Sequence, residues 1–455
     1  MNQPSRPTVP LVDIASCFEG VIPSTICSCA KDGTPNLTYL SIVHCIDANH
    51  VGLSNQFFNK TWKNIQENPR AQVIVCKPET GDQFRLDLRY ERTVTEGLVF
   101  GRIKTRLDAI ASQTGMSNIF KLRGVDIYEV LDCRYTAFPL HSETAEIESG
   151  DDVLALDAFM ERISTSTDLD SFLDESLKAL SALFDYDHSF LMVPDEQQQN
   201  LFTIASHGFD ASGVGSEVCI GEGIIGVAAK QKTIIRIASL ARDVVFSRAV
   251  RSGVELHGVG GPLEREIALP GLLSGQSNLV VPILAQDGLL GVLCLQSPVP
   301  GRFRASDERL MRIVSRHLAA RMALLHVQER TNSITEVKPT SPQGIFRSHR
   351  ESVVRYFRAD DSIFIDDGYL IKGVAGKIFW KLLKIHGATG RTDFSNKEIR
   401  LDSSLNLPDF KDNLESRLIL LRRRLAERCD FLVLSRVSRG QIHLDVRRRL
   451  ILEEL

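Results

Sequence analysis

Apolar and polar positions alternate along much of the first 140 residues, with turn-forming residues between the apolar runs. In "IPSTICSCAKDGTPNLTYLSIVHCIDANHVGLSN" we predict turns at Asp32-Gly33 and at residues 47–49. A short helix is predicted from Thr61 to Glu67, because an Asn-Pro pair follows it. Strands are predicted for "AQVIVCKP" and "YERTVTEGLVF", and a helix for "TRLDAIASQTGM". The first segment is therefore expected to be rich in β-strands.

Helical and strand patterns are mixed in the next segment. "VLALDAFMERISTSTDLDSFLDESLKALSALFDYDHS" is predicted to be one acidic amphipathic helix, followed by strands in "SFLMVP" and "LFTIAS". The glycines of "GEGIIGVAA" suit a strand-to-helix turn, where two backbones come close. "VVPILAQDGLLGVLCLQS" predicts a hairpin that turns at residues 286–288. The closing helix, in "FRASDERLMRIVSRHLAARMALLHVQ", carries one apolar stripe at steps of three and four residues: Met311, Val314, Leu318, Met322 and Leu325.

The last segment predicts a hairpin, several helices and a second hairpin. "SIFIDDGYLIKG" turns at residues 366–368, and "VAGKIFWKLLKIHGATG" is a predicted helix that ends at Gly387. Ser395 is a predicted helix cap, with Glu398 three residues later. "DNLESRLILLRRRLAER" is a helix with five arginines, and "FLVLSRVSRGQIHLDV" is a hairpin that turns at residues 439–440. The core face of the arginine-rich helix is formed by leucines at helical spacing: Leu414, Leu418, Leu421 and Leu425.

Two polar stretches without apolar periodicity divide the chain. "SETAEIESGDD" (142–152) and "TNSITEVKPTSPQG" (331–344) are predicted linkers. We therefore predict three domains, at residues 1–141, 151–330 and 345–455, and a multidomain α/β fold.

Charge is distributed unevenly between these segments. The formal net charge of the chain is −3, but residues 341–455 hold 22 Lys+Arg and 16 Asp+Glu, against 32 and 41 in the remainder. A basic terminal domain on an acidic body favours a nucleic-acid partner.

The cysteines and the hydropathy indicate the compartment. Nine cysteines are scattered among apolar residues, and the closest pair, Cys27 and Cys29, forms only a C-x-C spacing. Free thiols in a reducing cytoplasm fit this pattern. No stretch of 18 apolar residues and no signal-like start occur, so we expect a cytoplasmic protein without a membrane partner.

The first segment resembles the FMN-binding split β-barrel of the pyridoxamine-phosphate-oxidase-like family over about residues 20–135. The resemblance is carried by "KDGTPNLTYLSIV", "VGLSNQFFNKTWKNIQENPRAQVIV" and "RTVTEG". In that family an Arg-Lys pair before the helix holds the flavin phosphate. Here the pair position is Asn59-Lys60, so the lysine matches and the arginine does not. The resemblance implies an FMN site in which Lys60 neutralises the phosphate and Thr61 or Asn64 donates hydrogen bonds.

Other ligands are open for this barrel. His44 and His50 are polar candidates near the expected cavity, although each also fits as an ordinary strand or turn residue. Haem or another small ligand is one alternative to FMN, and a barrel that has kept the fold without a ligand is another.

The second segment resembles a GAF domain over about residues 153–328, on "GEGIIGVAA" and the hairpin "VVPILAQDGLLGVLCLQS". The resemblance implies a small-molecule sensing pocket or a dimerisation module, and we expect a homodimer through the closing helix. Phe303, Asp307 and Glu308 match part of a cyclic-nucleotide motif, but its Asn-Lys pair is missing, and Asp307 can instead cap the closing helix. His207 and His257 are candidates for binding metal or haem, or ordinary loop residues, and the ligand is unknown.

The third segment resembles the winged helix of response-regulator output domains over about residues 360–446, on "LESRLILLRRRL" and "SRVSRGQIHL". The resemblance implies that the outer face of the arginine-rich helix, with Asp412 and Ile419 on it, enters the major groove of double-stranded DNA. The DNA-contacting residues implied on the helix, the wing and the preceding helix are Ser416, Arg417, Leu420, Arg423, Arg424, Arg436, Arg439, Lys397 and Arg400. Ile419 and Leu420 depart from the polar or basic residues usual on this face, and equally suit a protein-binding surface.

Together these segments predict a one-component transcriptional regulator. The split barrel and the GAF domain would sense a small molecule or a redox cofactor, and the helix 306–330 would relay the change to paired winged helices. A flavin-dependent oxidoreductase with regulatory domains is one alternative, although no catalytic nucleophile, carboxylate pair or metal cluster is evident. A signalling adaptor that binds protein through the winged helix is the other.

Overall fold

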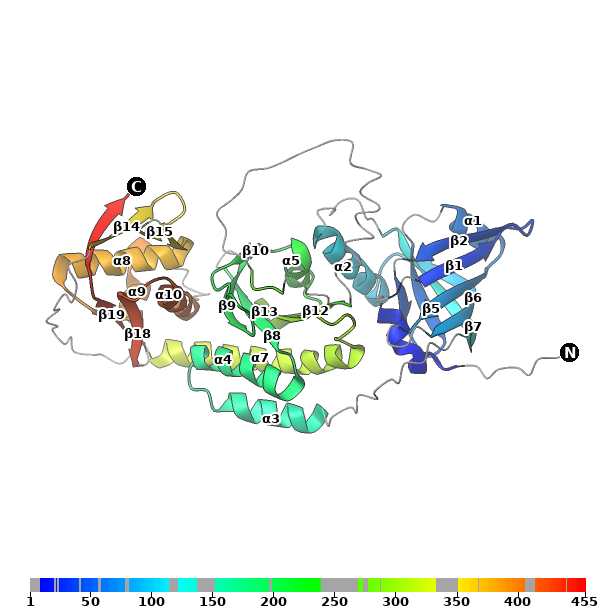
Figure 1. Ribbon diagram of the computed structural model, residues 1–455, viewed down its shortest axis with the longest axis horizontal. Helices are drawn as coiled ribbons and strands as arrows, with labels where there is room; N and C mark the ends of the chain where they lie inside the picture. The colour runs from blue at the N-terminus through cyan, green and yellow to red at the C-terminus, as the bar shows by residue number, and fades with distance from the viewer. Residues whose placement is uncertain are drawn as a thin grey trace.

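Three bodies follow one another along the chain in the computed structural model (Figure 1). We call them the N-terminal domain, the central domain and the C-terminal module. The structure describes the following residues: 9–19, 22, 24–40, 42–55, 59–77, 82–113, 122–136, 152–195, 199–238, 269–272, 277–286, 288–332, 351–366, 368–405, 414–438 and 440–455. Within these residues, no helix is long and apolar enough to cross a membrane.

The N-terminal domain is a seven-stranded, barrel-like antiparallel sheet in the order β2-β1-β5-β6-β7-β4-β3. A 3₁₀ segment, η1 (Leu11–Glu19), precedes it, and α1 (Asn59–Glu67) packs on β1 and β2. The strands are β1 (Ser24–Cys29), β2 (Pro35–Leu40), β3 (Val43–Cys45), β4 (His50–Asn55), β5 (Arg70–Cys76), β6 (Gln83–Val94) and β7 (Gly124–Tyr135).

The short helix α1 and strand β5 confirm the sequence predictions for this domain, but two others were wrong or missing. The strand predicted for "YERTVTEGLVF" ends at Val94, and Leu98 begins α2 (Leu98–Gln113). Gly97 between them has φ +95°, a left-handed conformation that breaks the strand. Strand β7 was missed because its first five residues are all buried, so apolar and polar positions do not alternate there.

The central domain is a six-stranded antiparallel sheet in the order β10-β9-β8-β13-β12-β11. One face packs on α4 (Leu169–Phe184) and α7 (Ala305–Asn332), and α3 (Asp152–Ser164) lies outside them. The other face packs on α5 (Gly223–Gln231) and on α2 of the N-terminal domain. The strands are β8 (His188–Pro194), β9 (Asn200–His207), β10 (Glu217–Cys219), β11 (Ile235–Ile237), β12 (Ser277–Ala285) and β13 (Gly288–Ser297).

The predicted single helix at the start of this domain is in fact two helices. Between α3 and α4 the chain turns at residues 165–168, and Asp168 caps α4 by accepting the backbone N–H of Ser171 at 3.0 Å. The polar run "STSTD" competes for backbone hydrogen bonds, which ends one helix and caps the next. The glycine turn before α5 and the β12–β13 hairpin are confirmed.

The apolar stripe of α7 packs on the sheet of its own domain. All five residues of the stripe are at most 1% exposed and belong to the core formed with α4 and the sheet. The stripe is therefore not available to a second copy of the chain, which removes the sequence-based reason for expecting dimerisation through it.

The described residues of the C-terminal module form two sheets, the helices α8 (Gly373–Thr389), α9 (Asn396–Leu401) and α10 (Leu414–Arg428), and a short 3₁₀ turn, η2 (Ser403–Leu405). The first sheet has the order β16-β15-β14-β20, in which β20 runs parallel to β14, and the second has the order β17-β19-β18. The strands are β14 (Glu351–Phe357), β15 (Ser362–Ile365), β16 (Gly368–Ile371), β17 (Asp393–Ser395), β18 (Leu432–Ser438), β19 (Gln441–Val446) and β20 (Arg449–Glu454).

Both predicted hairpins of this module are confirmed, as β15–β16 and β18–β19. Ser395 caps α9 by accepting the backbone N–H of Glu398 at 3.1 Å, also as predicted. Helix α8 continues past the predicted end at Gly387 to Thr389, and Gly390, at φ +69°, provides the left-handed cap. Strands β14 and β20 were not predicted.

Candidate functional site

Helix α10 is covered on both of its faces. The four leucines predicted as its core face are at most 5% exposed. The face predicted to enter a DNA groove is covered as well, because α10 also contacts α4 and β9 of the central domain. On that face Ser416, Arg417, Ile419 and Leu420 are between 2% and 7% exposed. In this conformation α10 therefore presents little surface to any partner outside the chain.

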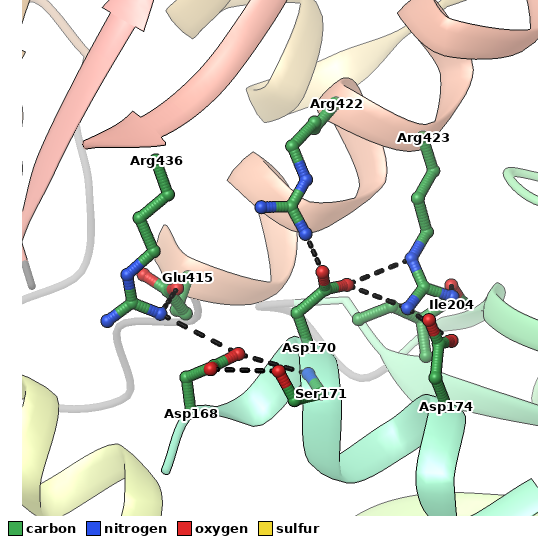
Figure 2. Close-up of polar contacts among 9 residues, drawn as sticks. All are labelled: Asp168, Asp170, Ser171, Asp174, Ile204, Glu415, Arg422, Arg423 and Arg436. Atoms are coloured by element: carbon green, nitrogen blue, oxygen red, sulfur yellow. Dashed lines mark hydrogen bonds and ion pairs between the residues drawn. The ribbon is translucent and has the colours of Figure 1, made fainter. Parts of the chain in front are cut away.

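Arg423 is the centre of the contact between α10 and the central domain (Figure 2). Its guanidinium donates to one Asp170 oxygen from Nε at 3.0 Å and from Nη2 at 2.7 Å. Nη2 also donates to Asp174 at 2.7 Å, and Nη1 donates to the backbone carbonyl of Ile204 at 3.0 Å. The fork of Arg423 thus holds α4 and β9 together, at a side chain that is only 16% exposed.

Two further arginines of the C-terminal module reach the start of α4. Arg422 pairs with the second oxygen of Asp170. Arg436, on β18, lies 3.2 Å from Glu415 and 3.9 Å from Asp168 through its Nη1. Burial, followed by the charge of Arg423, lowers the pKa of Arg422. The charged form of Arg422 is therefore disfavoured by its surroundings, and the nearby carboxylates offset that cost.

The carboxylates stand there because of how α4 begins. Asp168 is the N-cap, and Asp170 lies in the first turn, where negative charge offsets the positive end of the helix dipole. Sequence reasoning missed them because it continued one helix through this point. The available signal was the cap pattern in "STDLDSFLDES", where Asp168 precedes an apolar-periodic run.

Three more contacts extend the interface beyond this cluster. The guanidinium of Arg417 lies 4.1 Å from the centre of the Phe202 ring, a cation–π contact with β9. Lys372 pairs with Glu217 at 3.1 Å, and the hydroxyl of Ser212 donates to Glu427. The ion pairs between the two bodies join acids of the central domain to bases of the C-terminal module.

The other residues implied as DNA contacts are placed differently. Arg424 is buried, donating from Nε to the carbonyl of Leu370 at 3.0 Å and from Nη1 to Glu427 at 2.9 Å. It therefore fixes α10 to β16 and does not face outward. Lys397 and Arg400 lie on α9, where Lys397 is exposed. Arg439 and Asp412 lie outside the described residues.

Four of the predicted cofactor residues, Asn59, Lys60, Thr61 and Asn64, lie together on α1. Thr61 and Asn64 are buried, with Thr61 accepting from Asn36 at 2.8 Å and Asn64 donating to Ser28 at 3.2 Å. Lys60, next to them on α1, is exposed. Asn59 opens α1, and its side chain is outside the described part. Thr61 and Asn64 therefore form an internal polar contact with β1 and β2, beside the exposed Lys60.

His44 and His50 lie on other strands. His44 is on β3, at the opposite end of the strand order from β2, and it faces Arg102 and Arg106. His50 pairs with Asp47 at 2.8 Å, as an ordinary turn residue does.

The partial cyclic-nucleotide motif of the central domain has a structural role. Asp307 accepts the backbone N–H of Arg304 at 2.6 Å at the start of α7, and the hydroxyl of Tyr186 at 2.5 Å. Asp307 is therefore not the N-cap: it lies in the first turn of α7 and reaches back to the residue before the helix, as the acidic member of a capping box does. His257 lies outside the described residues, and within them no group of three or more His, Cys, Asp or Glu side chains could hold a metal ion.

The nine cysteines form no disulfide in the described residues, which include all of them. Burial raises the pKa of the Cys294 thiol, and raises the pKa of Cys133 and of Cys429 to about 11. These three thiols are held in the unreactive, protonated form at neutral pH.

Comparison with known proteins identifies the first two bodies. Residues 168–322 match the family model of the GAF domain, and residues 13–119 match the model described as pyridoxamine 5'-phosphate oxidase. These matches confirm a pyridoxamine-phosphate-oxidase-like N-terminal domain and a central GAF domain. No curated protein matches the chain.

Solved structures resemble the same two regions. An FMN-binding protein from Syntrophomonas wolfei subsp. wolfei is 20% identical, over 28% of this chain and 87% of its own, with a TM-score of 0.25. The GAF domain of a phosphoenolpyruvate-protein phosphotransferase from Acinetobacter is 20% identical, over 40% of this chain and 99% of its own, with a TM-score of 0.31. A free methionine-R-sulfoxide reductase from Neisseria meningitidis is 15% identical, over 42% and 99%, with a TM-score of 0.30.

Proposed function

We propose that the chain is a ligand-sensing transcriptional regulator in which the N-terminal and GAF domains control DNA binding by a C-terminal winged helix. In this mechanism α10 enters the major groove and the β18–β19 hairpin is the wing. The conformation described above is the closed form, since α10 cannot enter a groove while α4 and β9 cover its outer face.

The order of elements in the C-terminal module supports this proposal. A β-hairpin, three helices and a terminal hairpin follow one another, and the last helix carries consecutive arginines. The β18–β19 hairpin lies beside α10, so both elements could contact one duplex. The module is also the basic part of an otherwise acidic chain.

The observation that carries the proposal is the pairing of Arg423 with Asp170 and Asp174. Carboxylates of the sensor occupy the guanidinium that would otherwise be available to a phosphate or a base edge. Closed and DNA-bound forms therefore compete for one side chain. A ligand shifts that competition only if it binds one of the two arrangements more tightly.

DNA binding by the full chain tests this competition. The change Asp170→Lys removes the partner of Arg422 and Arg423 and adds repulsion, so it should open the interface. We expect Asp170→Lys to bind a labelled duplex of about 30 base pairs at least about tenfold more tightly than the unaltered chain in fluorescence anisotropy. The affinity should fall steeply with salt, and adding Arg423→Ala to Asp170→Lys should abolish the gain.

Glu161→Lys on α3 is the matched control. It makes the same change of charge at an exposed residue of the same domain. If Asp170→Lys and Glu161→Lys bind DNA equally well, added positive charge explains the gain and the competition is rejected. If no variant binds DNA at low salt, DNA binding is rejected, and a module that recognises protein through α10 becomes the better hypothesis.

FMN and a homodimer belong to the same proposal, with separate tests. FMN is supported by the family of the N-terminal domain, and absorbance of the purified protein at about 450 nm tests for it. A dimer would place two winged helices side by side on DNA. Among the described residues of α7, Ile313, Leu324 and Val327 are exposed and apolar, and light scattering would measure the mass in solution.

A further inference from the structure

A cavity of about 720 Å³ lies between the N-terminal and central domains, away from α10. One wall comes from β3 and α2 of the N-terminal domain. The opposite wall comes from the segment after α5, from β11 and β12, and from the first half of α7. Drug-sized and cofactor-sized molecules bind in cavities of roughly 300–1,000 Å³, so the space suits a small molecule.

Positive charge dominates the lining of this cavity. Among the described residues of the lining, six are basic and one, Glu308, is acidic. Both domains contribute to the basic set, which consists of Arg102, Arg106, Lys232, Arg236, Arg312 and Arg316. Like charges gathered from two domains repel one another, and an anion between them would remove that repulsion.

The single carboxylate is already engaged by two members of this set. Glu308 lies 2.7 Å from Arg312 and 3.6 Å from Arg236, so its charge is shared between them. His44 adds no negative charge, and burial, together with Arg102 and Arg106, lowers its pKa so that it is neutral at pH 7. The lining thus keeps an excess of positive charge.

Apolar side chains form much of the remaining lining, together with the hydroxyls of Thr233 and Ser315. Ile42, Leu98 and Ile103 lie on the N-terminal side, and Ile234, Pro282 and Leu284 lie on the central side. A ligand that suits such a lining has an anionic group and a flat or apolar part. Guanidinium groups bind phosphate through paired hydrogen bonds, which favours a phosphate as the anion.

We propose that this interdomain cavity binds a phosphorylated small molecule with an apolar or aromatic part, the chemistry shared by mononucleotides and flavin mononucleotide. The ligand would contact α2 from one domain and α7 from the other, and so would fix the two domains relative to each other. A nucleic-acid duplex is not an alternative, because a space of this volume between two domains does not admit one. The site supplies the ligand class for the proposed sensor, but its existence does not depend on DNA binding.

Calorimetric titration of the full chain with inorganic pyrophosphate, adenosine monophosphate and FMN tests the site, with adenosine as the uncharged comparison. We expect at least one phosphorylated probe to bind with one molecule per chain, and adenosine to bind more weakly. Arg102→Gln on α2 and Arg316→Gln on α7 should each weaken that binding at least about tenfold, because each removes a charge from one wall.

The matched controls are Lys104→Gln on α2 and Arg309→Gln on α7. Both are exposed residues of the same helices that do not line the cavity. Weakening in Arg102→Gln and Arg316→Gln but not in the controls supports the site. Equal binding in all four variants, or no binding of any phosphorylated probe at low salt, overturns it. The DNA measurement with Asp170→Lys needs no ligand, so the failure of either proposal is visible separately.

Discussion

The central domain contacts its two neighbours in opposite ways. Toward the C-terminal module it offers carboxylates, and each of the interface arginines 422, 423 and 436 lies against at least one of them. Toward the N-terminal domain it presents arginines and a lysine, and the N-terminal domain contributes two more arginines, Arg102 and Arg106, to the same cavity. One boundary is complementary in charge and closed, whereas the other gathers like charge around a cavity.

The α4–α10 contact is therefore neutralised by residues of the chain itself, whereas the basic lining of the cavity needs a bound anion to be neutralised. At the α4–α10 contact, each charge has an opposite partner within the chain, so the contact is stable without a ligand and must be broken to be used. At the cavity, the excess of positive charge destabilises the packing of α2 on the central domain, and a bound anion would remove that repulsion. The first boundary suits a latch, and the second suits a sensor.

Exchanging the charges of Asp170 and Arg423, the pair that we call the latch, should change the balance of closed and open forms most. Asp170→Arg and Arg423→Asp each place like charges face to face, and each should favour the open form by about 2 kcal/mol or more. The double variant restores one opposite pair but places like charges against Arg422 and Asp174, so it should recover only part of the closed form. Small-angle scattering would show a larger radius of gyration in each single variant than in the double variant.

A double variant as expanded as the two single variants would contradict a specific Asp170–Arg423 pair. Glu161→Arg, made on α3 away from the contact, controls for the change in net charge. The radius of gyration of this control should equal that of the unaltered chain.

Removing positive charge from the cavity should stabilise the chain, and the change in free energy should be smaller than at the latch. Without ligand, Arg102→Gln and Arg316→Gln relieve repulsion, and we expect each to stabilise the chain by up to about 0.5 kcal/mol, since both side chains are exposed. Thermal unfolding at low salt should show a small rise in Tm that disappears at high salt. A fall in Tm would mean that these arginines stabilise the unliganded structure, and the contrast with the latch would be lost.

The protonation of His44 gives the smallest and most local test. Burial first, then Arg102 and Arg106, lower the pKa of His44, against an opposing effect of Glu308. The unfolded chain, with an ordinary histidine pKa of about 6.5, therefore binds this proton more readily than the folded chain. His44 leaves stability unchanged above that pH and reduces it as the pH falls toward the folded-state pKa.

A titration of histidine ring signals by NMR, with His44→Gln for assignment, would measure this pKa. We expect it below the ordinary value, and we expect added pyrophosphate to raise it by screening the arginines. An unchanged value in the presence of pyrophosphate would place any bound anion away from His44. His207, on β9, serves as the reference signal that should not move.

Local elements of this fold follow from short sequence patterns, and the contacts between bodies do not. The cap at Ser395 and the hairpin at residues 439–440 were predicted because the residues that cause them are neighbours in the chain. The pairing of β14 with β20 was not, because it joins residues about a hundred positions apart and runs parallel.

The partners of the functional residues could not be predicted either, because they are distant in the sequence. The arginines of α10 were recognised from their number and spacing, but nothing near them in the sequence reveals that Asp170 is their partner. The cavity was missed for the same reason, since Arg102 and Arg316 belong to different domains. His44 was selected as a candidate, yet its neighbours are the arginines of α2 and not the residues of α1 that were grouped with it.

Helix α7 lines the cavity at its start and points toward the C-terminal module at its end. Its first turns carry Glu308, Arg312 and Arg316 into the cavity, and it then runs beneath the central sheet toward the C-terminal module (Figure 1). At 1.5 Å per residue, its 28 residues form a strut roughly 40 Å long. Because the apolar stripe of α7 packs into the sheet, the helix cannot move along its axis without the sheet. A tilt of the helix by about 3° at one end would displace the other end by about 2 Å. A displacement of that size is comparable to the length of a hydrogen bond, and α7 packs on α4, the helix whose carboxylates bind Arg423.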